Sequence, residues 1–420
     1  MKRFFLLLLF FIAAQSLCSA SEVTLEELLD KAGRDNPQIA AAKERYEASK
    51  ARIPQASALD DPRVDFKYDN MIPRMANMDA EDPGVMRTFG ISQEVPFPTK
   101  LLLRAQIAAK ESQIVYAQFK EKENEIVSRV KGLFSELAWI YKAIDIVREN
   151  KILLEQLEKA ASARFSLNKV SQQDVLKAQL EIAKMDNELI MLEQKRQVSQ
   201  AKLNILLNND PSEELGRPYI REDAAFSISL QQLNSAAKKY RRELEAFRLA
   251  VDRGRKTLSL AKQGYLPDFM FRYERMERSS ALKEWAGMVG ITIPLWFWQK
   301  QNFNVKEMKH ELKTMEAMYR DKENEVLLEV KDFYAQLEAM GKLAELFRTA
   351  YLPQADQSLK AALSGYESAQ TDFLNVLDSV RMLLDFKLDY YRTLIDFAIA
   401  QADLERAVGR DIEVVRGEQK

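Results

Sequence analysis

Hydrophobic positions in two long stretches of the chain recur with the alternating spacing of three and four residues that is typical of a coiled-coil seam. The members of the two seams are Val130, Leu133, Leu137, Ile140, Ile144 and Val147, and then Val330, Phe333, Leu337, Met340, Ala344 and Phe347. Proline is absent between Pro98 and Pro211, and Gly132 is the only glycine in that interval. Because both residue types are unfavourable inside helices, we expect a very long helix there, with Gly132 as the one place for an interruption.

Each helical stretch contains one segment that suits a turn. In the first stretch it runs from Ser166 to Ser171 around Asn168, and in the second from Gly365 to Thr371. The sequence therefore predicts two antiparallel helical hairpins, over residues 99–208 and 299–410.

Four shorter segments alternate apolar and polar residues with a period of two, which is the pattern of a strand with one apolar face. We expect strands at residues 62–70, 87–96, 267–276 and 285–295. The alternation is clear at Val64, Phe66 and Tyr68, between Asp65, Lys67 and Asp69. Two interpretations are open: soluble β-hairpins attached to a helical protein, or the aromatic-rich strands of a membrane barrel.

The chain repeats itself after about 200 residues, an interval too long for a solenoid repeat. The segments Glu121–Leu137 and Asp321–Leu337 are identical at seven of 17 positions. Gly90 and Ile91 recur as Gly290 and Ile291, so the strand pairs lie at equivalent places. We expect two similar repeats, residues 21–215 and 216–415, each with a helix, a strand pair and a helical hairpin, followed by a tail at 416–420.

The first 20 residues have the pattern of a secretory signal peptide. Lys2 and Arg3 precede an apolar run and the small residues around Ala20, after which we expect cleavage. The alternative is a lipoprotein anchored through Cys18, although Leu17 stands where such proteins have a small residue. Cleavage after Ala20 removes the single cysteine, which excludes disulfides and thiolate metal sites.

Export and the equivalent positions of the strand pairs favour the membrane interpretation. Four strands do not close a barrel, and unpaired edges are not tolerated in lipid. Several chains must then share one barrel, whose polar face lines water and is continued by a tube of helical hairpins. Without Lys2 and Arg3 the chain has three more acidic than basic residues, so nothing indicates a nucleic-acid partner.

Candidate chemistry is sparse. The segment between the first two strands contains four methionines and three acidic residues: Met71, Met75, Met78, Met86, Asp79, Glu81 and Asp82. Because thioethers bind Cu(I), one interpretation is a metal site. The other is a plain external loop. His310 is the only histidine. We find no nucleophile with a paired base, no phosphate-binding loop and no HExxH motif. We expect no enzyme activity, no catalytic residues, no cofactor and no metal site.

The chain resembles the TolC family of outer-membrane efflux proteins over essentially its whole mature length. The resemblance is carried by Asn36-Pro37, Asp61-Pro62, GISQEVPFPTK at 90–100, ARFSLNKVSQQDVLKAQ at 163–179, AKLNILL at 201–207 and GYESAQTDFLNVLDS at 365–379. The GISQEVPFP segment is most similar to the heavy-metal branch, whose pumps are of the RND type.

The resemblance implies a mainly helical trimer in the outer membrane of a Gram-negative bacterium. Each chain would add four strands to a shared 12-stranded β-barrel in the lipid, and the hairpins would form an α-barrel tunnel across the periplasm. The tunnel would be the passive exit duct of a tripartite efflux system and would meet a periplasmic adaptor and an inner-membrane pump at the hairpin tips. A periplasmic coiled-coil adaptor or scaffold is the alternative function. What is exported stays open.

The resemblance also implies a pore constriction just after the second tip. Two acidic family positions fall on Asn375 and Asp378, and the first-repeat counterpart of Asn375 is Asp174. The family's gating tyrosine matches Tyr366, and its arginine partner falls on Thr371. By spacing alone, Asp378 is equally a solvated helix residue. The partner-binding tip would comprise Phe165, Leu167, Asn168, Lys169, Val170 and Ser171.

Overall fold

The computed structural model of the chain describes residues 24–70, 85–219, 226–278, 283–368, 370–412 and 414. The expected signal peptide, the tail at 416–420 and the loop residues Met71, Met75, Met78, Asp79, Glu81 and Asp82 lie outside these ranges. The chain divides into two compact units. One combines Met1–Asn36, Arg129–Phe226 and Gln336–Ala402, and the other Pro37–Ser128, Ser227–Ala335 and Asp403–Lys420. Each unit therefore takes segments from both halves of the sequence.

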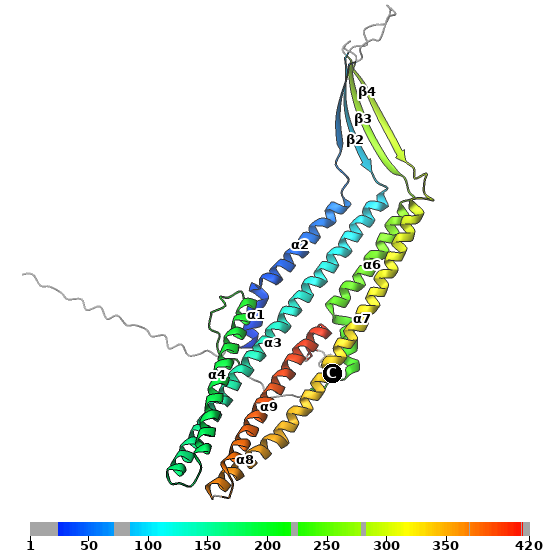
Figure 1. Ribbon diagram of the computed structural model, residues 1–420. Coiled ribbons are helices and arrows are strands. Elements are labelled where there is room, and N and C mark those ends of the chain that lie inside the picture. The colour runs from blue at the N-terminus through cyan, green and yellow to red at the C-terminus, as the bar shows by residue number, and fades with distance from the viewer. Residues whose placement is uncertain are drawn as a thin grey trace, which may run out of the picture. The chain divides into compact units, whose positions relative to one another are not determined.

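The first unit is built of helical hairpins (Figure 1). Its helices are α1 (Leu25–Asp35), α4 (Gln172–Leu206), α8 (Leu352–Glu367) and parts of α3 (Pro98–Ser166), α7 (Gln301–Leu346) and α9 (Phe373–Val408). The expected seam is buried at Val130, Leu137, Ile140, Ile144 and Val147. Helix α3 runs through Gly132 without interruption. None of the described helices combines the length and the apolar character needed to cross a bilayer.

The first arm of the second hairpin is not one continuous α-helix. Between α7 and α8, residues Phe347–Tyr351 form a π-helical turn, η1. Pro353 follows at the start of α8. Proline has no N–H to give to the carbonyl one turn back, and its ring crowds that carbonyl. A π-turn changes the local hydrogen-bond register and is a common way to absorb such a defect. The alternating apolar pattern continues through this site, so periodicity alone gave no sign of it.

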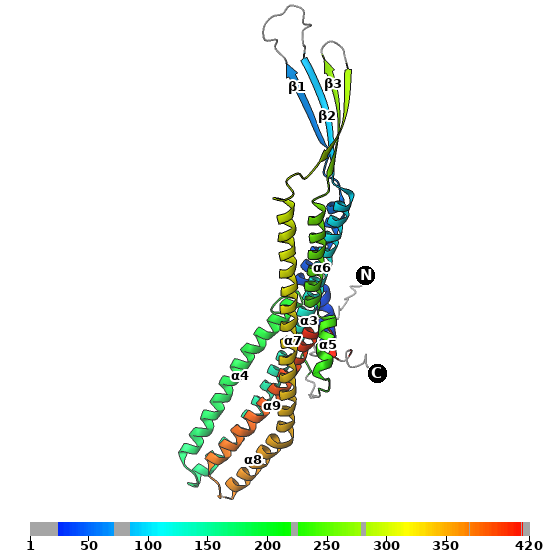
Figure 2. The same ribbon diagram turned by 90° about the vertical axis from the view of Figure 1, so that its right-hand side faces the viewer.

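The second unit contains the four strands that the alternation predicted, in one antiparallel sheet of order β1-β2-β3-β4 (Figures 1 and 2). They are β1 (Arg63–Asn70), β2 (Val85–Val95), β3 (Asp268–Arg278) and β4 (Lys283–Thr292). The unit also holds α2 (Pro37–Ser57), α5 (Leu230–Tyr240), α6 (Arg242–Gln263) and the remaining parts of α3, α7 and α9.

The two faces of the sheet differ in polarity. The register aligns Val64 with Ile91 and Phe66 with Phe89, so that apolar side chains share one face. Exposed members of this face are Val64, Phe66, Tyr68, Phe89, Ile91, Phe271, Tyr273, Trp285, Val289 and Ile291. The opposite face carries charged side chains such as Asp65, Arg272 and Glu274. This is the arrangement of a sheet with lipid on one side and water on the other.

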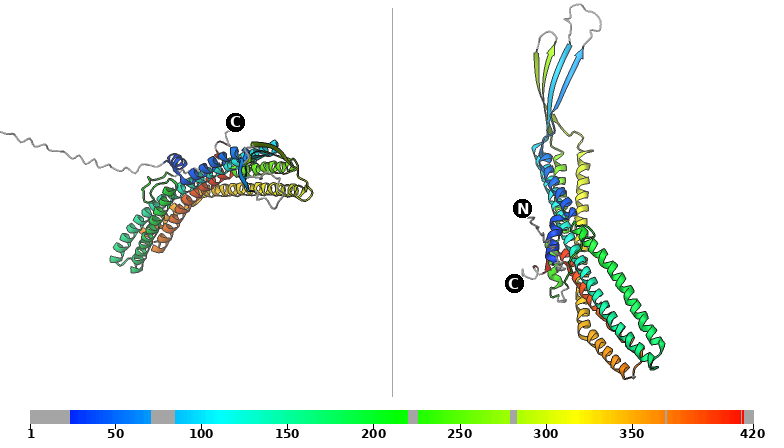
Figure 3. Two further views of the ribbon diagram at one scale, coloured as in Figure 1. Left: turned by 90° about the horizontal axis from the view of Figure 1, so that it is seen from above. Right: turned by 90° about the vertical axis from the view of Figure 1, so that its left-hand side faces the viewer.

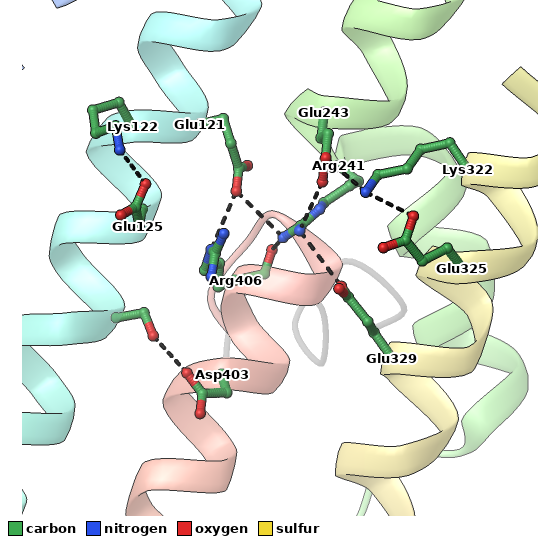
Figure 4. A network of polar contacts seen from close by, with 11 residues as sticks. Glu121, Lys122, Glu125, Arg241, Glu243, Lys322, Glu325, Glu329, Asp403 and Arg406 are labelled. Atoms are coloured by element: carbon green, nitrogen blue, oxygen red, sulfur yellow. Dashed lines mark hydrogen bonds and ion pairs between the residues drawn. The ribbon is translucent and has the colours of Figure 1, made fainter. Parts of the chain in front are cut away.

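A buried ionic network fastens α9 in the second unit (Figure 4). Arg241 lies between α5 and α6 and is only 3% exposed. Its guanidinium donates to the backbone carbonyl of Arg406, which belongs to the last turn of α9. It also faces carboxylates from three helices, Glu121 at 3.6 Å, Glu243 at 3.2 Å and Glu329 at 3.5 Å. Because buried charges need several partners, this network ties the last turn of α9 to the carboxylates of α3, α6 and α7.

Candidate gate at the hairpin tips

The turns of the two hairpins lie side by side within the first unit, as the separate views agree (Figures 1 and 3). The α3–α4 turn follows from Asn168, whose φ of 54° places it in the left-handed region. Asparagine tolerates this conformation better than most residues, and Lys169 N then donates to the Arg164 carbonyl at 3.0 Å. A shared apolar cluster joins both hairpins; it includes Leu154, Leu157, Ala161, Ala178, Leu359, Tyr366, Phe373, Val376, Leu377 and Val380.

Tyr366 belongs to this cluster and not to the exposed surface. It is 5% exposed, and its ring lies 5.5 Å from that of Phe373. Its hydroxyl has no hydrogen-bond partner among the described residues. Burial raises the pKa of Tyr366, while the Arg164 charge opposes that rise. Tyr366 is therefore a neutral phenol packed in the tip, and the structure does not place it beside Asp378.

Arg164 clamps the second tip from the first hairpin. Its guanidinium lies 4.4 Å from the Tyr366 ring centroid. It donates to the carbonyls of Tyr366 at 2.6 Å and Glu367 at 3.1 Å. These carbonyls close α8, and the end of a helix has carbonyls without helical partners and a partial negative charge. One arginine thus satisfies two of these carbonyls and stacks on the buried tyrosine ring, a cation–π contact worth about 1–2 kcal/mol where the groups are largely desolvated.

Asn375 and Asp378 are exposed on the first turns of α9, where Val376 and Leu377 between them are buried. Asp378 has a cationic neighbour one turn further on, since its Oδ1 lies 3.4 Å from Arg381. Asp378 and Arg381 thus form an acid–base pair on the exposed side of the helix.

Arg381 also reaches a buried acid on the other hairpin. It donates to both carboxylate oxygens of Glu181, at 2.5 and 3.1 Å. Glu181 is 4% exposed and receives a second cation, Lys184, at 2.6 Å. The hydrogen bond from Arg381 lowers the pKa of Glu181, so the carboxylate stays ionised. The fork shape of arginine suits this two-oxygen contact, which couples α4 and α9 just beyond the tips.

The other predicted gate residues are in the tip region but do not meet Asp378 in a described contact. Thr371 N donates to the Gly365 carbonyl at 3.1 Å. A Cβ on Gly365 would lie only 2.4 Å from Thr371 Oγ1, so a larger residue here would force the Thr371 side chain or the turn to shift. Asp174 is half-buried near the start of α4, and its N–H donates to the Ser171 carbonyl at 3.2 Å.

The predicted docking residues differ in exposure. Phe165 and Leu167 are 41% and 65% exposed, and Lys169 is also exposed. Val170 is partly buried against the shared cluster, while Ser171 precedes the first turn of α4. The tip therefore presents an apolar pair beside a cation.

Sequence reasoning missed Arg164, Glu181 and Arg381. All three stand in helical segments where a charged residue normally faces solvent. Only the packing of the two hairpins brings Arg164 to the carbonyls of Tyr366 and Glu367 and brings Arg381 to Glu181. The one local signal was that Arg381 follows Asp378 by three residues, a spacing that brings side chains together on a helix.

The sequence profile of the family described as "Outer membrane efflux protein" matches residues 28–209 and 233–410. The chain belongs to this family. Its members are channels and not enzymes, and they form the exit ducts of tripartite efflux systems in the Gram-negative outer membrane, with a helical tunnel in the periplasm. The alternative of a periplasmic adaptor has no support.

Two relatives span nearly the whole chain. The cobalt-zinc-cadmium resistance protein CzcC of Cupriavidus metallidurans is 21% identical over 398 residues, 93% of this chain and 91% of the relative. The outer membrane protein TolC of Vibrio cholerae is 21% identical over 403 residues, 92% of this chain and 90% of the relative.

Solved structures share the fold of this efflux protein. CusC superposes with a TM-score of 0.80 at 15% identity and covers 93% of each chain. VceC of Vibrio cholerae superposes with a TM-score of 0.78 at 17% identity, and the match covers 92% of this chain and 96% of VceC. The fold class predicted from the sequence is thereby confirmed for the single chain: it is mainly helical, with long antiparallel helical hairpins and four antiparallel strands.

Proposed function

We propose that this efflux protein is a homotrimeric duct for metal cations, served by a periplasmic adaptor and an RND-type pump. The observation that carries the cargo proposal is the extent of the match to a protein named for cobalt, zinc and cadmium resistance, which covers 93% of this chain. The charge on the polar face of the sheet agrees with it. Carboxylates outnumber cations there, which favours cation passage.

The case for a homotrimer rests on the two edges of the sheet. Strands β1 and β4 each have only one neighbour among the described strands. In lipid an open edge leaves backbone donors and acceptors without partners, so β4 of one copy must pair with β1 of the next. Three chains of four strands give the 12-stranded barrel that the sequence resemblance implies.

The gate is proposed at Asp378 and Asn375, and Tyr366, Thr371 and Asp174 are proposed to take part in it. Three copies of an exposed carboxylate around an axis narrow a pore and attract cations. Arg381 partly offsets the negative charge of Asp378, because its guanidinium lies 3.4 Å from the Asp378 carboxylate. The same guanidinium also donates to Glu181. Removal of the Asp378 carboxylate would leave Arg381 paired with Glu181 alone.

The adaptor is proposed to dock on the first tip at Phe165, Leu167 and Lys169, supported by Asn168, Val170 and Ser171. Exposed apolar side chains beside a cation suit a partner with a small apolar groove and an acidic rim. The barrel face that carries Phe66, Trp285 and Val289 is proposed to meet the lipid.

Single-channel recording tests the gate. In planar bilayers Asp378→Ala should lower the preference for cations and raise conductance, because the carboxylate is lost and Arg381 is left. Asn375→Asp should do the reverse and add blockade by multivalent cations. Asp356→Ala, which alters an exposed Lys360 pair on α8, is the matched control. Parental conductance and selectivity in Asp378→Ala would move the gate elsewhere.

Metal tolerance tests the cargo. A strain that lacks the gene should lose tolerance to Co²⁺, Zn²⁺ or Cd²⁺, and the intact gene should restore it. Crosslinking of the purified protein in detergent should give trimers. Unchanged tolerance to all three ions would reject these metals as cargo, and a monodisperse monomer would reject the trimer.

A further inference from the structure

The polar face of the sheet carries four methionines, at positions where a water-lined strand normally has polar residues. They are Met86 on β2, Met270 and Met276 on β3 and Met288 on β4. In the register they share a face with Asp65, Glu94 and Arg272. Met288 is 53% exposed. A thioether gains little from water, so these side chains need a reason to be there.

From their positions we infer that the methionines form two sites for soft monovalent metal cations, Cu(I) or Ag(I). Each site consists of two thioethers and one carboxylate. The inference extends the proposed metal function to a further class of ion, but binding to the purified protein is tested without reference to any cargo.

The helix-proximal methionine site consists of Met270, Met288 and Glu94. Glu94 lies directly opposite Met270 in the register of β2 and β3. Met270 pairs with Gly290 on β4, which makes Met288 its diagonal neighbour, two residues along. A Cβ on Gly290 would lie 3.1 Å from the Met270 Cε, so the Met270 side chain extends over this glycine toward β4. The missing side chain at Gly290 leaves room for the two thioethers to approach.

The helix-distal methionine site repeats this set toward the other end of the strands. Glu284 lies directly opposite Met276 in the register of β3 and β4. Met276 pairs with Thr88 on β2, which makes Met86 its diagonal neighbour. Diagonal neighbours are about 7–8 Å apart and within reach of long side chains. Methionine has three rotatable bonds, so two diagonal thioethers can meet at one ion.

The one cation beside the proximal site is turned away from it. Arg272 lies opposite Met288 in the register. Its guanidinium, however, donates to Asp65 on β1 at 2.7 Å and to Glu274 at 2.5 Å. Two carboxylates, Asp65 on β1 and Glu274 on β3 itself, therefore balance its charge. The electrostatic potential near the thioethers is left favourable to a cation.

The donor set selects the class of ion. Thioethers are soft ligands that prefer Cu(I), whereas Co²⁺ and Zn²⁺ prefer imidazole, thiolate and carboxylate. The described residues contain no group of three or more His, Cys, Asp or Glu side chains that would suit a divalent ion. The methionine sites are thus expected to discriminate between monovalent soft ions and borderline divalent ions.

Metal binding to the detergent-purified full chain tests the inference. We expect Met270→Leu/Met288→Leu to lose about one equivalent of Ag⁺ per chain, and Met86→Leu/Met276→Leu to lose another, because thioethers supply the binding. Leucine conserves the volume of methionine, and Met318→Leu, an exposed position on α7, is the matched control. Glu94→Gln should weaken the proximal site alone.

X-ray absorption at the silver edge should show sulfur neighbours in the parent, fewer in each pair variant and unchanged numbers in the control. Circular dichroism and crosslinked trimer yield establish that the variants fold. Parental Ag⁺ stoichiometry in both folded pair variants overturns the inference, as does an equal loss in Met318→Leu. Failure of the metal-tolerance test, in contrast, would reject the proposed cargo but would not affect the conclusion about Ag⁺ binding to the purified protein.

Discussion

Replacement of Arg241 by methionine should destabilise the protein severely at neutral and mildly alkaline pH. The change keeps an apolar stem of similar length but removes the charge that Glu121, Glu243 and Glu329 share. It also removes the donor to the Arg406 carbonyl. Removal of one partner from a buried ion pair costs about 3–5 kcal/mol when the remaining charge has no other partner. The loss here should lie at the lower end of that range, because Glu121 keeps Arg406 at 3.2 Å and Glu243 keeps Lys322 at 2.6 Å.

The pH dependence of this loss identifies its cause. Burial raises the pKa of Glu121, while Arg241 and Arg406 oppose that rise. Without Arg241 the pKa rises further. A carboxyl whose folded-state pKa is raised stabilises the fold below its unfolded pKa and loses that contribution as pH rises through the folded value. The difference between Arg241→Met and the parent should therefore be small in acid and grow as pH increases.

The assay is thermal unfolding of the detergent-purified protein, followed by the helical circular dichroism signal. With an unfolding entropy of about 2.1 cal/mol/K per residue, a loss of about 3 kcal/mol lowers the apparent Tm by about 3–4 °C. Arg242→Met is the matched control, since Arg242 forms a half-exposed pair with Glu245 at 2.8 Å, and ion pairs open to solvent contribute about 0–1 kcal/mol. If Arg241→Met melts together with this control in alkaline buffer, the network does not stabilise the fold as argued.

Three further predictions concern the tips. Lys169→Glu should weaken crosslinking to the adaptor and leave the trimer intact, because the Lys169 side chain is exposed. If reagents outside intact cells label this tip, the proposed periplasmic orientation is wrong. Glu181→Gln should lower the apparent Tm near neutral pH by the equivalent of about 1–2 kcal/mol, since a charge-assisted hydrogen bond is lost. The pKa of Glu181 is lowered by Arg381, so the parent loses this stabilisation as pH falls through the folded pKa, and the variant should show a flatter pH profile. Gly365→Val should disturb the second tip and change channel gating, because the new side chain would meet Thr371; parental gating would show that the turn adjusts.

The sequence determined the local character of the elements. The seam from Val130 to Val147 predicted buried coiled-coil positions, and the alternation at Val64, Phe66 and Tyr68 predicted a strand with one apolar face. Both patterns act over a few residues, so side-chain chemistry is enough to specify them. The two-repeat organisation stays a prediction from internal similarity, because the compact units are assembled from both halves.

Tertiary structure alone decided which segments meet. The pairing of Val95 with Phe269 joins strands from different halves, and the same kind of distant contact buries Arg241 and Glu181 and clamps Tyr366 beneath Arg164. A charged residue in a helix has the same local pattern whether it faces water or a distant carboxylate. Its environment depends on packing between segments far apart in the chain, and periodicity carries no information about that packing.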